Sequence, residues 1–252
     1  MGTILVENLT KDYGNGRGVF DVTFEVNAGE VFGFLGPNGA GKTTTIRQIL
    51  GFNKPQQGKV QVNGIDVWGN SHITNKDIGY IAGEIAFPNN FKGFELIKWL
   101  GSLSGTKELE RANELIDILE IRHAVNTKIK RYSKGMKQKI AIISALMHDP
   151  SILIFDEPSS GLDPLMQEIF TNLVKAEKAK GKTILLSSHI FQEIEKTCDR
   201  VAIIKEGRVV TEFRMDELSD LRCEKCRGKS SLEEYFMQFY KKKKETEKGG
   251  NK

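Results

Sequence analysis

A glycine-rich loop between a predicted strand and a predicted helix constrains this chain more than any other feature. Residues 36–43 are Gly-Pro-Asn-Gly-Ala-Gly-Lys-Thr and match the pattern G-x-x-x-x-G-K-[ST] in full. The apolar run Val31–Leu35 precedes the loop, and the helical run Thr44–Leu50 follows it. The order strand, glycine-rich loop, helix is typical of α/β folds that bind phosphate at the start of a helix. We therefore expect an α/β fold with a phosphate-binding loop here.

The residue types in this loop suit a bound phosphate chain. Its glycines let the backbone wrap an anion with the N–H groups pointing inward, and the positive end of the helix dipole faces the same anion. Lys42 can reach the β- and γ-phosphates of a nucleotide, and the Thr43 hydroxyl can ligate Mg²⁺. A glycine-rich surface turn with a solvated lysine is the alternative, and the complete motif in its strand–helix setting argues against it. The expected nucleotide-binding residues are Gly36, Pro37, Asn38, Gly39, Ala40, Gly41, Lys42, Thr43 and Thr44.

Two carboxylates follow a second apolar strand. Residues 152–155 are apolar, and Asp156 and Glu157 come directly after them, before Pro158. Asp156 is placed to hold Mg²⁺ through water, and Glu157 can orient and deprotonate an attacking water. Alternatively the carboxylates cap the turn before Pro158, but the phosphate loop in the same chain favours the catalytic interpretation.

Strand-like and helical runs alternate along the chain. From about Phe94 to His148 the apolar spacing is helical, which indicates a helical insertion of about residues 84–150. Apolar strands that alternate with helices predict a mainly parallel sheet covered on both faces. We expect one domain over residues 1–240 and a Lys-rich disordered tail over residues 241–252. The expected strands are Ile4–Leu9, Val19–Val26, Glu30–Leu35, Lys59–Asn63, Ile78–Ile81, Ile152–Phe155, Thr183–Ser187, Val201–Ile204 and Arg208–Phe213, and helices are expected near Leu165–Lys178 and Ile190–Lys196.

Charge and composition restrict the classes of partner and the compartment that we expect for this chain. The net charge of +4 is carried by the tail 241–252, which has six Lys and two Glu, so the other 240 residues sum to zero. A neutral body argues against a nucleic-acid-binding protein. No run of about eighteen apolar residues and no secretory signal is visible, so we expect a cytoplasmic protein. Cys198, Cys223 and Cys226 are too few for a disulfide framework, and the pair Cys223 and Cys226 lacks the second pair of a zinc site.

Four further motifs resemble those of the ATP-binding-cassette (ABC) family. Residues 132–139, Tyr-Ser-Lys-Gly-Met-Lys-Gln-Lys, resemble its signature sequence, and residues 161–163, Gly-Leu-Asp, resemble its D-loop. His189 follows the strand Thr183–Ser188, as the switch histidine of the family does, and Tyr13 matches the aromatic residue that stacks on adenine. The resemblance covers about residues 3–240. It implies a P-loop NTPase of ABC type with a parallel core sheet, an antiparallel β-subdomain and an inserted helical subdomain.

The resemblance also implies a mechanism shared between two copies. In the family, two ATPase subunits meet head to tail and trap two ATP molecules. By position, Ser133 and Gly135 would bind the γ-phosphate held by the partner's Lys42, and Asp163 would lie at the subunit seam. His189 would sense the γ-phosphate. The implied cofactors are ATP and Mg²⁺, and the implied roles are catalysis by Glu157, His189 and Lys42, metal binding by Thr43 and Asp156, and ATP binding by Tyr13, Ser133, Gly135 and the loop residues.

Two positions depart from the family pattern. Lys134 stands where the signature usually has glycine, and Ala82-Gly83-Glu84 stands where a glutamine-containing loop is expected. This variant resembles the ABC-2 exporter group, which includes the ATPases of antibiotic- and peptide-resistance exporters. The resemblance implies a subunit that powers a separate membrane-spanning permease from the inner face of the cell membrane.

Two other functions stay open at this point. One is a regulatory cassette that binds ATP with little hydrolysis, and the other is a non-transport ABC ATPase that acts on chromosomes or ribosomes. Asp156, Glu157 and His189 argue against the regulatory cassette. The chain has neither a long coiled coil nor a second cassette, which argues against the non-transport function.

Overall fold

Two sheets and eight α-helices make up the described part of the chain. The computed structural model describes residues 3–106, 109–218 and 231–241. The four-stranded sheet is antiparallel, with the order β2-β1-β4-β5. It consists of β1 (Ile4–Asp12), β2 (Gly18–Val26), β4 (Gln57–Val62) and β5 (Ile65–Asp66). Apolar side chains alternate along β1 and β2, so that one face of this sheet is buried.

The six-stranded sheet is parallel except for its edge strand β10, and its order is β10-β9-β3-β8-β7-β6. Every residue of β3, β7 and β8 is buried, as expected for parallel strands that are covered on both faces. The strands are β3 (Val31–Leu35), β6 (Ile78–Ile81), β7 (Ile152–Asp156), β8 (Thr183–Ser188), β9 (Arg200–Lys205) and β10 (Arg208–Arg214).

The helices cover the parallel sheet on both faces. Phe32, Phe34 and Ile154 point to a core shared with α1 and the antiparallel sheet. Leu153 and Phe155, the alternate residues of β7, point to a second core shared with α3 to α7. The helices are α1 (Lys42–Ile49), α2 (Ser71–Thr74), α3 (Gly93–Leu103), α4 (Glu110–Ile118), α5 (Lys134–Leu146), α6 (Pro164–Ala179), α7 (Phe191–Thr197) and α8 (Leu232–Lys241), with short 3₁₀ turns at Asn75–Asp77, Ile129–Arg131 and Met215–Glu217.

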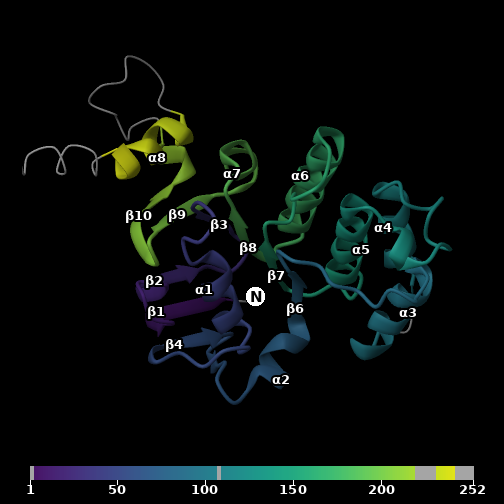
Figure 1. Ribbon diagram of the computed structural model, residues 1–252, viewed down its shortest axis with the longest axis horizontal. Coiled ribbons are helices and arrows are strands. Elements are labelled where there is room, and N and C mark those ends of the chain that lie inside the picture. Colours follow the sequence, from purple (N-terminus) through teal and green to yellow (C-terminus); the bar gives the residue numbers. More distant parts are fainter. Residues whose placement is uncertain (1–2, 107–108, 219–230, 242–252) are drawn as a thin grey trace, which may run out of the picture.

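Figure 1 shows how the helices between β6 and β7 are arranged. Helices α3, α4 and α5 lie together on the right, apart from α1 and the antiparallel strands on the left. The expected α/β class, with a mainly parallel core sheet, an antiparallel sheet and inserted helices, is confirmed. No helix in the three described ranges is long and apolar enough to cross a bilayer.

Helix α8 was not predicted from the sequence. It packs by aromatic contacts, because the ring of Phe236 lies 5.0 Å from that of Phe191 and the ring of Tyr235 lies 5.0 Å from that of Phe213. The spacing of Leu232, Tyr235, Phe236 and Phe239 is the signal that could have identified this helix. Its last residue is Lys241, so the first residue of the expected disordered tail is helical. Residues 242–252, and Cys223 and Cys226, lie outside the described residues.

Candidate active site

Glycines shape the loop that leads from β3 to α1. A Cβ on Gly36 would lie 2.5 Å from the carbonyl oxygen of Ile204, and a Cβ on Gly41 would lie 2.7 Å from Cγ1 of Val19. Gly41 also has a φ of +111°, which a residue with a side chain rarely adopts. Gly41 is the N-cap of α1 and supplies no side-chain cap, so the first N–H groups of the helix remain available to an anion.

Lys42 is buried at the start of α1, with only 5% of its surface exposed. Its ammonium donates hydrogen bonds to the carbonyl oxygens of Gly36 (2.6 Å) and Pro37 (3.1 Å). It also forms an ion pair with Glu157, whose Oε1 lies 2.9 Å away. The ammonium is therefore held against the loop and against the predicted catalytic carboxylate.

Asp156 is the last residue of β7 and is completely buried. The Thr43 hydroxyl donates to its Oδ2 at 2.7 Å, and the Ser187 hydroxyl donates to its Oδ1 at 2.6 Å. Because β7 pairs with β8 in a register that places Asp156 opposite Ser187, the sheet itself positions this serine. Ser187 was not singled out from the sequence, since strand pairing decides its place.

Glu157 connects Lys42 to His189. Its Oε2 lies 2.6 Å from Nδ1 of His189, on the side of the carboxylate away from Lys42. Its backbone has a φ of +52°, and its N–H donates to the carbonyl oxygen of Ser187 at 3.1 Å. A positive φ at a glutamate carries strain of the kind that accumulates at functional sites. The structure thus brings together the three predicted catalytic residues, which lie at the start of α1 and directly after β7 and β8.

Glu193 supports the segment that carries His189. The Ser188 hydroxyl donates to Oε2 of Glu193 at 2.5 Å and accepts a hydrogen bond from the N–H of Ile190 at 3.0 Å. Burial raises the pKa of the Glu193 carboxyl above its usual range, and the nearby charge of Glu157 acts in the same direction. This carboxyl was also not singled out from the sequence.

Glu193→Gln is expected to gain stability relative to the parent protein as the pH rises. A raised pKa means that the folded chain holds this proton more tightly than the unfolded chain, so the stability of the parent falls as the pH rises from the ordinary glutamate range through the raised pKa. Glutamine has no such loss. Melting temperatures of both proteins at pH 5 and pH 8 measure the effect, at about 2–4 °C for each kcal/mol. A difference in melting temperature between the two proteins that is the same at pH 5 and pH 8 would contradict this prediction.

A cleft of about 500 Å³ opens beside Lys42 and Glu157. Tyr13 lies in its lining with 54% of its surface exposed, and the Lys11 ammonium lies over its ring, 5.8 Å from the centroid. Four lining residues, Gly16, Arg17, Gly18 and Arg47, were missed from the sequence. Arg47 lies one helical turn after Thr43 on α1, and that spacing was the available signal. The lining residues are Tyr13, Gly16, Arg17, Gly18, Asn38, Gly39, Gly41, Lys42, Thr43, Thr44, Arg47 and Glu157.

Ser133 and Gly135 are not among the residues that line this cleft. Ser133 is the N-cap of α5, where its Oγ accepts a hydrogen bond from the N–H of Met136 at 3.2 Å. In Figure 1, α5 lies on the far side of β6 from α1. Asp163 caps α6 and accepts a hydrogen bond from the N–H of Met166 at 3.0 Å. One chain therefore does not bring the resembled signature residues to the phosphate loop.

Gly83 lies directly beside Asp156. A Cβ at Gly83 would be 3.2 Å from Oδ2 of Asp156, so this position faces the carboxylate without a side chain. Glu84 is exposed and makes no hydrogen bond or ion pair with the described part of the chain. No side-chain amide reaches the carboxylate from this position.

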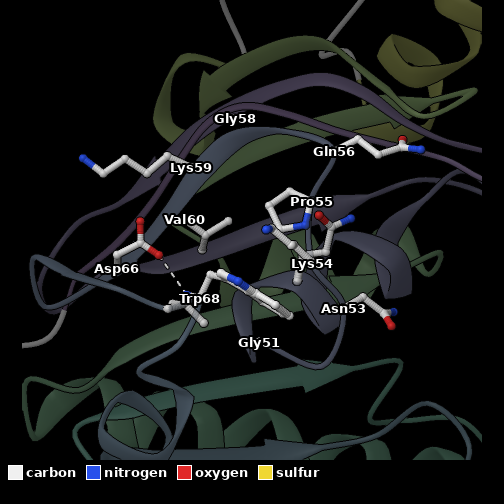
Figure 2. A pocket seen from close by; sticks show the side chains of 12 residues that line it. Gly51, Asn53, Lys54, Pro55, Gln56, Gly58, Lys59, Val60, Asp66 and Trp68 are labelled. Atoms are coloured by element: carbon white, nitrogen blue, oxygen red, sulfur yellow. Dashed lines mark hydrogen bonds between the residues drawn. The ribbon is translucent and has the colours of Figure 1, made fainter.

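Figure 2 shows the side chains that line a second hollow, beside β4. Its volume of about 290 Å³ is smaller than that of the first cleft. The Lys54 ammonium lies over the ring of Trp68, 5.5 Å from its centroid, and the backbone N–H of Trp68 donates to Oδ1 of Asp66 at 2.8 Å. This hollow shares no lining residue with the larger cleft. Because the larger cleft is lined by loop residues, Lys42 and Glu157, it is the candidate nucleotide site.

Comparisons with known proteins identify the family of the chain. The sequence profile described as ABC transporter matches residues 19–160, which is more than half of the chain. An uncharacterized ABC transporter ATP-binding protein of Methanocaldococcus jannaschii is 38% identical over 218 residues, covering 85% of this chain and 79% of that protein. A bacitracin transport ATP-binding protein of Bacillus licheniformis is 37% identical over 220 residues, covering 86% of this chain and 72% of that protein.

Solved structures show the same fold. The ATP-binding subunit of an ABC transporter matches with a TM-score of 0.85 and 31% identity over 94% of this chain and 99% of that chain. A dimeric ATP-binding cassette in a post-hydrolysis state, bound to ADP and Pi, matches with a TM-score of 0.76 over 84% of this chain and 98% of that chain. The identity to this second structure is 24%, so it bears on the fold alone. The phosphate loop, the paired carboxylates and these relatives together show that the chain belongs to the ABC transporter family, as an ATP-binding and ATP-hydrolysing protein.

Proposed function

We propose that two copies of this chain pair head to tail around two MgATP molecules and so drive a separate membrane permease of the exporter type. The observation that carries the proposal is the chain of contacts from Lys42 through Glu157 to His189 beside a nucleotide-sized cleft. These contacts supply a phosphate-binding cation and a base for water, and the signature residues lie elsewhere in the same chain.

Each residue of the contact chain has a distinct task. Lys42 holds the β- and γ-phosphates, for which it exchanges its present contacts with the loop carbonyls and Glu157. Glu157 orients the attacking water and takes its proton. His189 holds the second oxygen of Glu157 and fixes the direction of that carboxylate. Tyr13 stacks on adenine at the mouth of the cleft.

The residues around Asp156 fit Mg²⁺. A buried carboxylate and the Thr43 hydroxyl in contact with it form a small set of hard oxygen donors. No group of three His, Cys, Asp or Glu side chains that could hold a metal occurs in the described ranges. Asp156 and Thr43 would hold Mg²⁺, which would neutralise phosphate charge when bound.

Pairing of two copies completes the site. Ser133 offers a hydroxyl, and the first N–H groups of α5 lie beside it, which is a favourable arrangement for a phosphate. Because neither Ser133 nor Gly135 lines the cleft of its own chain, a phosphate contact by them needs a second copy. In that pair, Ser133 and Gly135 contact the γ-phosphate bound by the partner's Lys42.

The names of the relatives support a role in export. Besides the bacitracin transport protein, a Nod factor export ATP-binding protein of Rhizobium etli is 34% identical over 223 residues, covering 87% of this chain and 71% of that protein. We place the chain at the inner face of the membrane, bound to its permease. A regulatory cassette with little hydrolysis would not require the contacts among Lys42, Glu157 and His189, and no finding supports a chromosomal or ribosomal role.

Light scattering tests the pairing. The chain is expected to be monomeric without nucleotide, because two polar phosphate sites face each other across the seam, and dimeric once ATP and Mg²⁺ occupy them. Ser133→Arg places a bulky side chain against the partner's nucleotide and is expected to prevent the dimer. Lys130→Arg, a substitution at a nearby exposed lysine, is the control. A stable dimer in nucleotide-free buffer, or a Ser133→Arg variant that still dimerises with MgATP, would contradict the proposed seam.

A further inference from the structure

Two side chains of α5 hold the loop that follows Glu157. The Lys134 ammonium donates a hydrogen bond to the Ser160 hydroxyl at 2.8 Å. The buried amide of Gln138 donates to the carbonyl oxygen of Pro158 at 2.5 Å. Residues 134 and 138 lie one turn apart on α5 and so occupy one face of the helix. Helix α5 therefore forms two hydrogen bonds to residues 158–161 of its own chain.

The lysine stem adds packing to the hydrogen bond. Gly161 has a φ of +86°, and a Cβ there would lie 2.9–3.2 Å from three carbons of the Lys134 side chain. A Cβ on Gly135 would lie 2.8 Å from the carbonyl oxygen of Gly161. The start of α5 and the loop thus touch through backbone as well as side chain, which leaves little room for one to move without the other.

The loop in turn is bonded to Glu157. The N–H of Ser160 donates to the carbonyl oxygen of Glu157 at 3.1 Å, and the N–H of Leu162 donates to the carbonyl oxygen of Ser159 at 3.0 Å. Leu162 is buried in the core, so the far end of the loop is fixed. The contacts therefore run from Lys134 to Ser160 and from Ser160 to the backbone of Glu157.

We propose that Lys134 is a positioning residue that couples the two ATP sites of the dimer. The inference rests on the proposed head-to-tail pair, in which Ser133 and Gly135 contact the partner's nucleotide while Glu157 acts on the nucleotide of its own chain. Lys134 lies between Ser133 and Gly135 in the sequence, and its hydrogen bond to Ser160 connects the start of α5 to the loop that follows Glu157. Binding of Ser133 and Gly135 to the partner's nucleotide then positions the Glu157 carboxylate for hydrolysis of the ATP that its own chain binds.

A direct contact of the Lys134 ammonium with the partner's phosphate is the competing role. In this structure the Ser160 hydroxyl accepts a hydrogen bond from that ammonium, and the stem lies along Gly161. The two roles differ in what Ser160 does: positioning needs the serine hydroxyl, whereas a direct phosphate contact does not.

A double-mutant cycle tests the coupling. Lys134→Met keeps the aliphatic stem and removes the ammonium, Ser160→Ala removes the hydroxyl, and the third protein carries both changes. Lys134→Arg keeps a cation on a similar stem. Lys130→Met, which removes a charge from a side chain that makes no hydrogen bond or ion pair with the described residues, is the control. For each protein we would measure kcat and KM for ATP, the dimer fraction with MgATP, and the affinity of the monomer for ADP by calorimetry.

Each single change is expected to lower kcat by about 2- to 10-fold, the range of one solvent-exposed hydrogen bond. The double change is expected to cost no more than one of the singles, because both remove the same interaction. ADP affinity should stay within 2-fold of the parent, since ADP binds at Lys42 and the loop, and a general folding defect would lower it. Lys134→Arg should retain most of the parent rate.

Three outcomes would overturn the inference. Additive losses in the double variant would show that Lys134 and Ser160 act independently. A loss with Lys134→Met and none with Ser160→Ala would assign the lysine to direct phosphate binding. A parent protein that hydrolyses ATP without a nucleotide-dependent dimer would remove the proposed pair itself and the inference with it, whereas the first two outcomes leave the pair intact.

Discussion

Glu157→Gln is expected to bind MgATP as tightly as the parent protein and to hydrolyse it more slowly by about 10²-fold or more. The amide keeps the shape of the side chain and an oxygen beside the Lys42 ammonium, but it cannot take the proton of the attacking water. Binding depends on Lys42, Thr43 and the N–H groups of the loop, which the change leaves in place. The dimer with two ATP molecules should accumulate, because hydrolysis is its exit route.

A paired measurement checks this result. Steady-state turnover gives the rate, and size-exclusion chromatography with MgATP gives the dimer fraction. Glu7→Gln makes the same chemical change at a half-exposed residue of β1 whose carboxylate lies 3.9 Å from the Lys59 ammonium, and it should leave both quantities unchanged. A Glu157→Gln rate within a few-fold of the parent would show that another group removes the proton.

Lys42→Ala is expected to weaken MgATP binding tenfold or more. In the parent protein the Lys42 side chain is buried, so its hydrogen bonds to the phosphates are shielded from water. One charge-assisted hydrogen bond contributes about 1.5–3 kcal/mol. Calorimetric titration with MgATP measures the change.

The truncation also leaves the Oε1 atom of Glu157 without its cation, so the melting temperature of Lys42→Ala must be measured beside its affinity. Lys59→Ala, at an exposed lysine outside the nucleotide cleft, is the matched control and should bind as the parent does. Unchanged affinity of a folded Lys42→Ala protein would contradict the assignment of the phosphate loop.

The parts of the site that follow from local sequence were predictable. The loop 36–43 is contiguous, and its glycines are required where the backbone is crowded or has a positive φ, so the motif carries its own geometry. The strands β3, β7 and β8 were predictable for a similar reason, because parallel strands that are buried on both faces have continuous apolar sequences.

Contacts between distant segments were not predictable in detail. Thr43 and Asp156 are 113 residues apart, and their hydrogen bond depends on the order and register of the strands. Ser187 contacts Asp156 for the same reason. Lys134 stood out in the sequence only as a departure from glycine, and its bond to Ser160 becomes visible once α5 is packed beside the loop. Helix α8 is short and is held by aromatic contacts with distant elements, which single-sequence spacing reveals weakly.

Mixing two inactive variants tests the shared site most directly. Lys42→Ala lacks the phosphate cation, and Ser133→Arg blocks the signature end of α5, so each variant alone should hydrolyse little ATP. A mixed pair contains one site with the intact Lys42 of one chain and the intact Ser133 of the other. Equal amounts of the two variants are therefore expected to recover ATPase activity well above either alone. If the mixture is no more active than its components, or if Ser133→Arg alone is fully active, the site is not shared between two copies.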